Sequence, residues 1–353
     1  MRRLGAAIAA VLLVVAAILI RNNVIEGDGS GGGGVRLLCA SELEAACTDL
    51  ADHSDVSVTV EPAGVTARSL VALPGDQRPD FDAWLVPSPW PQMVDVQRRA
   101  EEPAKTPLFA KPSDPIGRSP LVLVARADRA PVLQATPECN AKVDWKCIGA
   151  VAGRAWTDLP GGQAAWGTVK PGPGDPTVSA TALLVASQAT SEFLDKIDYA
   201  KEDLDSDQYL DWVNGIERAV PKLPPTAGSP FAAMVQQLPT ATYDVVGTAE
   251  EEAAPGIADA APDRRRALTL LYPEPVVTAD VVLAAVAADP RKDDAESLTG
   301  DLAAPLARQG WRVPGQPAAR GVRDTPALPR SSGLPSDPGA LVALQETWGG
   351  IPK

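Results

Sequence analysis

The sequence predicts an α/β protein of two lobes, each with a mixed, mainly parallel sheet flanked by helices. Short apolar segments alternate with amphipathic ones along residues 35–124, and this order is typical of parallel sheets. Two turns, at Ser41 and Ser179, lead from an extended segment into a helix that starts with hydroxyl residues. At 353 residues the chain is long enough for two globular units.

The first part of the chain supplies four expected strands joined by three expected helices. The strands are 35–40, 56–60, 81–86 and 119–124, and the helices are 42–52, 67–73 and 90–99. In parallel sheets, ligands bind beyond the carboxyl ends of the strands. Ser41, Thr66 and Ser88 lie at those ends and are therefore candidate site residues.

A second unit follows with a looser pattern. The expected strands are 156–159, 166–170, 243–248, 267–272 and 276–280. The expected helices are 182–193, 231–238, 295–308 and 338–347, and a further helix is expected to start at the acidic residues 250–252. We find no internal repeat in this pattern.

The two hydroxyl-rich turns are candidate ligand sites. Ser41 with Glu44 fits a capping box, in which each side chain satisfies a free amide of the first helical turn. Ser179 opens the second such helix. Amides at a helix start also attract anions and polar ligands. The alternative is that both serines only cap their helices.

The N-terminal segment predicts a membrane anchor. Met1-Arg2-Arg3 precedes an apolar run over residues 4–20, and the basic residues favour a cytoplasmic N-terminus. The run has no small-x-small cleavage site at its end, so an uncleaved anchor over 1–21 is favoured over a cleaved secretion signal. Residues 22–34 are a glycine-rich tether. The rest would lie outside the cell, on a single-pass anchor or, alternatively, secreted.

Four cysteines form two closely spaced pairs, Cys39 with Cys47 and Cys139 with Cys147. An even count beyond an export segment indicates two local disulfides. Cys39 and Cys47 also fit two buried thiols, because they fall at a strand end and inside a helix. Neither spacing is typical of a zinc site.

Composition restricts the partners and the core. The formal net charge of −13 argues against a nucleic-acid partner, which needs a basic surface. Aromatic residues are only 5% of the chain, so alanine, valine and leucine are expected to fill the core. Trp84 is an expected core residue, whereas Trp90 and Trp166 are candidates for a cleft.

The residue patterns of enzymes are mostly missing, and no catalytic residue, cofactor or metal is expected. His53 is the only histidine and lies in a polar loop, so a Ser-His-Asp triad would depend on it alone. The carboxylates of residues 250–252 are expected on a solvated face. Asp203, Asp205 and Asp207 match part of a calcium loop but lack its glycine and terminal glutamate.

From Val35 onward the chain resembles the type 2 periplasmic solute-binding proteins. It is most similar to the molybdate- and sulfate-like branch and to extracellular solute-binding domains of actinobacteria. The matching segments, in order, are 38–43, 58–66, 79–88, 118–124, 167–170 with 175–180, and 244–248.

The resemblance implies two lobes joined by crossing strands, with ligand held between them by a hinge motion. Lobe 1 would comprise 35–118 and 263–353, and lobe 2 would comprise 119–262. A small polar solute or oxyanion would contact residues at strand ends and helix starts: Ser41, Gly64, Thr66, Ser88, Ser119, Ser179, Ala180 and Thr248.

Two functions follow from the resemblance. The first is an envelope-anchored solute-binding protein that delivers its ligand to a membrane transporter. The second is a binding-protein-like module that senses, or contacts other envelope proteins, without solute transport. An open, hydroxyl-lined cleft would favour the first function. A cleft filled by Trp90, Trp166 or the proline-rich segment 314–335 would favour the second.

Overall fold

A sheet of eight strands runs through the structure in the order β2-β1-β3-β8-β4-β6-β5, with β7 paired to β4. The computed structural model describes residues 34–75, 77–103, 105–221, 229–236 and 242–351. Contacts join Val35–Lys353 into one unit. The predicted membrane anchor and most of the tether lie outside the described residues. Among those described, no helix has the length and apolar character needed to cross a membrane.

Lobe 1 is built on three parallel strands. They are β1 (Val35–Ala40), β2 (Val56–Glu61) and β3 (Ala83–Pro87), joined by α2 (Glu44–Ala51) and α3 (Ala63–Ala72), and α4 (Trp90–Glu101) follows β3. An ion pair fixes the start of this sheet, because Arg36 of β1 bonds Asp82 before β3 through its backbone amide at 2.8 Å and its side chain at 2.5 Å.

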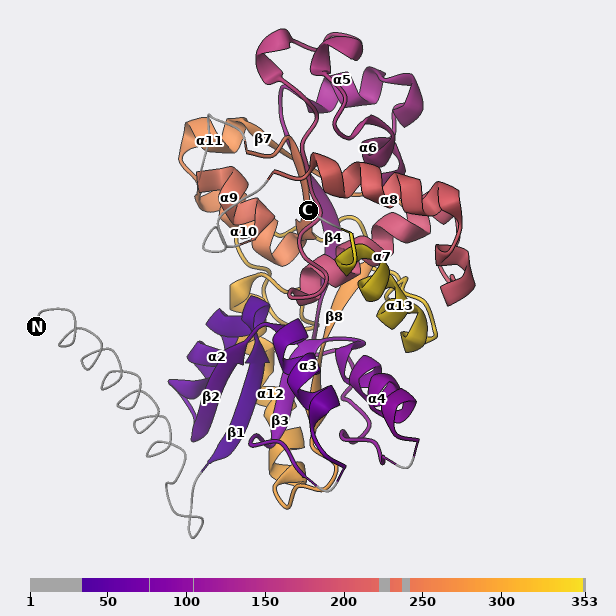
Figure 1. Ribbon diagram of the computed structural model, residues 1–353. Helices are drawn as coiled ribbons and strands as arrows, with labels where there is room; N and C mark the ends of the chain where they lie inside the picture. The colour runs from indigo at the N-terminus through magenta and orange to yellow at the C-terminus, as the bar shows by residue number, and fades with distance from the viewer. Residues whose placement is uncertain (1–33, 76, 104, 222–228, 237–241, 352–353) are drawn as a thin grey trace, which may run out of the picture. The chain divides into compact units, whose positions relative to one another are not determined.

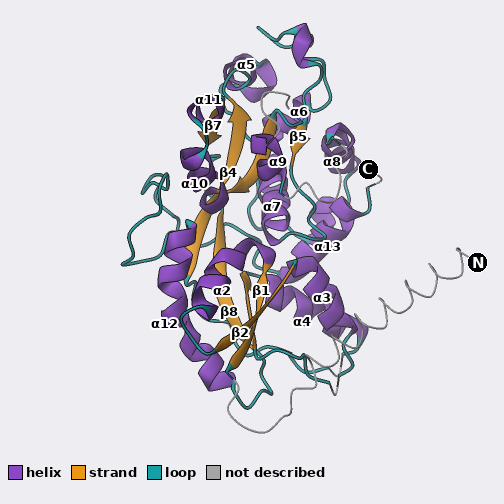
Figure 2. Cartoon of the chain, turned by 90° about the vertical axis from the view of Figure 1, so that its left-hand side faces the viewer, coloured by secondary structure: helices purple, strands orange, loops and turns teal. Residues whose placement is uncertain are grey.

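Two long antiparallel strands are shared by both lobes. They are β4 (Gly117–Arg126) and β8 (Thr278–Ala285), which run between the lobes in Figures 1 and 2. The first residues of β4 pair with β8, and its later residues pair with β6. Strand β8 pairs first with β4 and then with β3. The predicted crossing strands are therefore present.

Lobe 2 carries the second half of β4 with β5 (Pro171–Gly172), β6 (Val245–Ala249) and β7 (Leu268–Leu271). Its helices are α5 (Ala130–Ala135), α6 (Trp145–Val151), α7 (Ala180–Leu194), α8 (Asp207–Ala219), α9 (Pro230–Gln236), α10 (Glu250–Asp259) and α11 (Pro262–Arg266). Short 3-10 turns lie between them, η2 (Pro137–Cys139), η3 (Trp156–Asp158), η4 (Ala164–Trp166) and η5 (Lys201–Leu204).

The C-terminal part of the chain returns to both lobes. Helix α12 (Lys292–Gln309) packs on α2 in lobe 1, and α13 (Pro338–Gly349) packs on α4 of lobe 1 and on α7 and η5 of lobe 2. A hydrogen bond of 2.9 Å from Trp348 Nε1 to the Tyr209 hydroxyl fixes α13 to α8. Helix α13 therefore bridges the two lobes.

Segment 310–335 lies along the crossing strands. The backbones of Arg118 in β4 and Arg312 exchange two hydrogen bonds. The Arg118 side chain donates to the Pro329 carbonyl at 2.6 Å, and the Thr278 amide of β8 donates to the Ser332 carbonyl at 2.8 Å. These bonds tie the segment to the strands about which a hinge would bend.

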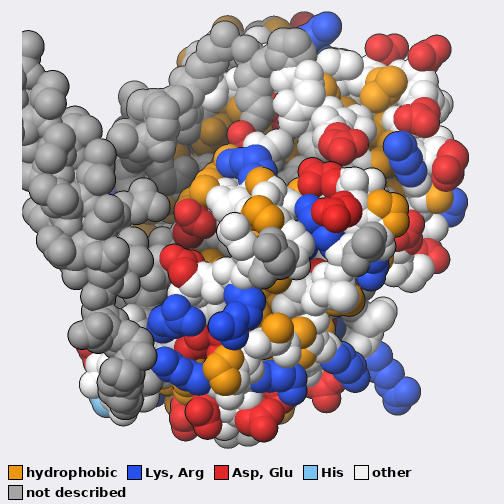
Figure 3. All heavy atoms as spheres, turned by 60° about the horizontal axis from the view of Figure 1, so that its bottom comes forward, with side chains coloured by type: hydrophobic (Ala, Val, Ile, Leu, Met, Phe, Trp, Pro, Cys, Tyr) orange, Lys and Arg blue, Asp and Glu red, His pale blue; other side chains and the backbone are white. Residues whose placement is uncertain are grey.

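Tryptophans take a larger part of the core than the composition predicted. Trp84, Trp90, Trp145, Trp156, Trp311 and Trp348 are among the largest fully buried side chains. Figure 3 shows charged side chains of both signs interspersed on one face of the molecule. Ion pairs such as Lys292–Glu296, at 2.9 Å, are in keeping with that mixture.

Several sequence predictions need correction. Lobe 2 is not mainly parallel, because β4 pairs antiparallel with both β6 and β7 and only the two-residue β5 runs parallel to β6. The expected strands at 156–159 and 166–170 are replaced by η3, η4 and β5. Residues 263–271 lie with lobe 2 rather than lobe 1, because β7 pairs with the lobe 2 half of β4.

Tyr209→Phe tests how α13 is held. The change leaves the buried Trp348 N–H without its acceptor, so we expect a loss of about 1–3 kcal/mol of unfolding free energy in urea denaturation. Tyr243→Phe is the matched control, because Tyr243 is a buried residue whose hydroxyl forms no hydrogen bond within the described chain. Equal losses in the two variants would contradict this account of α13.

Candidate functional site

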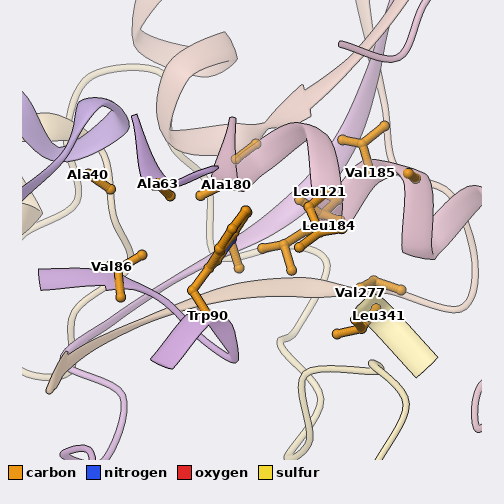
Figure 4. Close-up of a cluster of buried hydrophobic side chains, with 14 of the residues drawn as sticks. Ala40, Ala63, Val86, Trp90, Leu121, Ala180, Leu184, Val185, Val277 and Leu341 are labelled. Atoms are coloured by element: carbon orange, nitrogen blue, oxygen red, sulfur yellow. The ribbon is translucent and has the colours of Figure 1, made fainter. Parts of the chain in front are cut away.

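Trp90 fills the space where the predicted ligand turns meet. Its side chain is 0% exposed. Figure 4 shows the indole between Ala40 and Ala63 of lobe 1 and Ala180 and Leu184 of lobe 2. An apolar side chain therefore lies beside Ala40, Ala63 and Ala180, which adjoin the predicted ligand turns in the sequence. Of the predicted site residues, Ala180 is buried beside this indole.

The first turn of α7 binds a carboxylate from the other lobe. Ser179 is the N-cap of α7, as predicted, and its Oγ accepts from the Ala182 amide. The same Oγ donates to Glu42 Oε1 at 2.7 Å, and the Thr181 amide donates to that oxygen at 3.2 Å. A helix N-terminus attracts negative charge through its free amides and its dipole. Glu42 thus takes the place in which the sequence predicted an anionic or polar solute.

Gly64 lets the two lobe backbones approach closely. Its amide, at the start of α3, donates to the Val178 carbonyl at 2.9 Å. A Cβ at this position would lie 2.0 Å from the Thr177 carbonyl oxygen. Arg68 Nη1 also donates to that oxygen, at 2.7 Å, and Gln345 Nε2 of α13 donates to the Pro176 carbonyl at 2.9 Å. The turn 175–179 is therefore held by α3 and α13 as well as by Glu42.

The acidic start of α10 is buried, contrary to the expected solvated face. Glu250 pairs with Arg312 at 2.6 Å and accepts from the Tyr272 hydroxyl at 2.5 Å. Burial raises the pKa of the Glu251 carboxyl well above its ordinary value, and the carboxylates of Glu252 and Glu42 raise it further. The start of α10 and Glu42 therefore form a region rich in carboxylates. Such a region favours the binding of cations or protons over the binding of oxyanions.

The remaining predicted residues have other local partners. Ser119 Oγ accepts from the Glu251 amide at 3.0 Å, and Thr248 Oγ1 donates to the Glu252 carboxylate. Thr66 Oγ1 donates to Glu61 at 2.6 Å. The amide of Ser88, which follows β3, donates to the Asp280 carbonyl at 2.7 Å. Their roles in ligand binding stay predictions.

The predicted capping box at Ser41 is wrong. The 3-10 turn η1 (Ser41–Leu43) has Ala40 as its N-cap, and no side chain caps either η1 or α2. Ser41 itself is exposed. The 3-10 turn displaces the start of the helix from residue 42 to Glu44, and Glu42 rather than Ser41 bonds lobe 2.

Both predicted disulfides are present. Cys39 bonds Cys47 and Cys139 bonds Cys147, with Cα–Cα distances of 6.7 and 4.5 Å. The first bridge links the end of β1 to α2 and so closes the loop that carries Glu42. The alternative of buried free thiols at Cys39 and Cys47 is therefore excluded.

The other candidates have structural partners. Trp166 stacks on the Arg129 guanidinium at 3.7 Å in lobe 2, and the Asp203 carboxylate accepts from the Lys196 side chain at 2.6 Å. His53 Nδ1 lies 2.8 Å from the Asp49 carbonyl oxygen on an exposed surface. In the part of the chain that the structure describes, no group of three or more acidic, histidine or cysteine side chains is arranged to hold a metal.

Solved structures of similar fold are periplasmic binding proteins. AfuA from Actinobacillus pleuropneumoniae, with fructose-6-phosphate bound, is 12% identical, with a TM-score of 0.56 over 91% of this chain and 99% of that one. Apo FutA2 from Synechocystis PCC6803 is 12% identical, with a TM-score of 0.54 over 91% and 98%. A periplasmic thiamin binding protein is 9% identical, with a TM-score of 0.53 over 90% and 94%.

No protein-family model and no curated protein sequence matches this chain. The comparisons nevertheless confirm the fold predicted from the resemblance, that of the type 2 periplasmic solute-binding proteins.

Gly64→Ala tests the close approach of the lobes. The added methyl group would overlap the Thr177 carbonyl, so we expect a loss of about 1–3 kcal/mol in unfolding free energy. Gly300→Ala, within α12, is the control because a Cβ there meets nothing within 4 Å. That change is expected to stabilise the helix by about 0.5–1 kcal/mol. A neutral Gly64→Ala variant would show that the lobes do not meet there.

Glu251→Gln tests the buried carboxyl by its pH dependence. Because the folded pKa of Glu251 is raised, its contribution to stability is fully present below the unfolded pKa of about 4.3 and is lost as pH rises through the folded pKa. The glutamine does not titrate. We therefore expect Glu251→Gln to gain stability relative to wild type as the pH rises above the unfolded pKa, measured by denaturant titrations. A difference that is constant with pH would contradict this.

Proposed function

We propose that this chain is a module of the cell envelope that has the fold of a solute-binding protein but acts by contacting other proteins. The observation that carries the proposal is Trp90, whose indole is fully buried between the lobes where a solute would lie. Truncating a buried tryptophan to alanine leaves a cavity and lowers the unfolding free energy by about 3–5 kcal/mol. The packing of Trp90 therefore contributes strongly to holding the lobes together.

The contacts that a bound solute would supply are already made within the chain. Ligands close a hinged protein because they bind the closed form better than the open one. Here Glu42 binds the first turn of α7, and Gly64 binds the turn before it. Gln345 of α13 binds the same turn, and segment 310–335 is bonded to the crossing strand β4. This combination favours a permanently closed pair of lobes.

The proposal includes an envelope location. The apolar run at 4–20 would anchor the chain in the membrane, and the glycine-rich residues 22–34 would hold the lobes outside the cell. The two disulfides support an oxidising compartment. The membrane fraction should therefore retain the full-length chain after an alkaline carbonate wash. Release of the chain into the soluble fraction would favour cleavage and secretion.

Capture of a small polar solute for a membrane transporter is the second candidate. It is favoured by the hydrogen bonds from Ser179 and Thr181 to Glu42, because an anionic group from the other lobe is accepted at the start of α7. On this alternative, a solute would displace Glu42 as the lobes open. The carboxylates of α10 are unfavourable for an oxyanion at that position.

Hydrogen exchange separates the two functions. In a permanently closed module, the Gly64 and Thr181 amides should exchange only through global unfolding, as slowly as the central strand β4. In a protein that opens to take up solute, they should exchange faster than β4 and become protected when the solute is added.

A thermal-shift screen of the full-length chain with oxyanions, sugars and sugar phosphates is a second test, with Ser179→Ala as the control variant. Ser179→Ala removes one donor to Glu42, so solute capture predicts a saturable shift that this variant abolishes. A closed module predicts no shift that depends on Ser179. A Ser179-dependent shift would overturn the proposed function.

A further inference from the structure

A cavity of about 210 Å³ lies on the lobe contact, beside Gly64. Its walls come from α3 and α4 of lobe 1, the 175–178 turn of lobe 2, and α13. Gly64 is the one predicted solute-site residue that lines it, whereas Trp90 and Ser179 do not. The volume lies below the 300 Å³ or so at which pockets for drug-sized ligands begin, which suits a small molecule.

Two opposite charges line this cavity without an ion-pair partner. Arg68 donates through Nη1 to the Thr177 carbonyl, and no carboxylate of the described residues pairs with its guanidinium. Glu346 of α13 is exposed, and no cation in the described ranges pairs with its carboxylate. Both charges therefore remain available to a ligand, although they do not bond each other.

Amide side chains and an apolar base complete the lining. Gln345 donates to the Pro176 carbonyl through Nε2, which leaves its Oε1 as an acceptor. Gln97 of α4 makes no hydrogen bond to any described residue. Ala67 and Gly349 add apolar surface, and a Cβ at Gly349 would lie 2.3 Å from Thr177 Cγ2. Gly349 thus lets α13 approach Thr177 closely enough for the two to form one wall of the cavity.

We propose that this cavity binds a zwitterion of the size of a small α-amino acid or a short peptide. Arg68 receives the carboxylate, because its planar guanidinium matches a carboxylate in geometry and charge. Glu346 and the Gln345 carbonyl oxygen receive the ammonium group. Because the walls belong to both lobes and to α13, the ligand stabilises the folded chain by mass action. It therefore acts as an effector of the closed module.

Isothermal titration calorimetry of the full-length chain with alanine tests the proposal. We expect saturable binding that weakens at least tenfold in Arg68→Gln and in Glu346→Gln. Glu346→Gln is the safer variant, because its side chain makes no bond within the described chain. Arg99→Gln and Glu44→Gln remove exposed charges outside the cavity and should leave the affinity unchanged.

The ligand series identifies which charges are needed and where the zwitterion comes from. Acetate and ethylamine each carry one of the two charges and should bind at least tenfold more weakly than alanine. Dialanine that binds more tightly than alanine would support the proposal and assign a peptide as the source. Absence of saturable binding, equal binding of acetate, or affinity unchanged in both cavity variants would overturn it.

Discussion

The burial of Trp90 between the lobes is the interaction on which the rest of this structure depends. The indole leaves α4 at its first residue and reaches alanines at the starts of α3 and α7. Small residues at those positions provide the room that a large side chain needs. Because protein interiors are packed as densely as organic crystals, the lobes cannot separate without losing these contacts. The close approach at Gly64 and the hydrogen bonds to Glu42 form only when the lobes are as near to each other as the packing of Trp90 holds them.

The electrostatics of the lobe contact follow from the same closure. Closing brings Glu42 to the first turn of α7, where amides and a helix dipole stabilise its charge. It also brings Glu42 into the field of Glu251 and Glu252, which are kept from water. The pKa values of Glu251 and Glu252 are raised, mainly by burial. A chain with formal net charge −13 thus brings some of its acids near enough to raise each other's pKa.

Part of this organisation could be predicted from sequence, and the reason differs from element to element. Strands β1 and β3 of lobe 1 are short and mostly apolar, so local pattern was sufficient to predict them. Ser179 was predicted as a cap because capping depends on neighbouring residues only. The antiparallel pairing of β6 and β7 with β4 joins residues more than a hundred positions apart. Local patterns carry no information on such pairs.

The candidate site illustrates the same limit at finer scale. Trp90 was predicted as a cleft candidate, but it is buried against α7, which lies far along the chain. Glu42 was missed because the 3-10 turn η1 changes which side chain faces lobe 2. The acidic run at the start of α10 resembles a surface segment until Arg312 and Tyr272 are brought to it.

The sharing of β4 and β8 has a consequence for how the chain is made. Lobe 2 is an insertion in lobe 1, since β8 and α12 follow all of lobe 2 in the sequence. When residues 35–271 have left the ribosome, β3 has β1 on one side but still lacks β8 on the other, and an unpaired strand edge of apolar residues is prone to wrong pairing. Lobe 2 already has its own strands by then. The chain is therefore expected to complete its second lobe before its first, with the edge of β3 as the surface that a chaperone must protect in the interval.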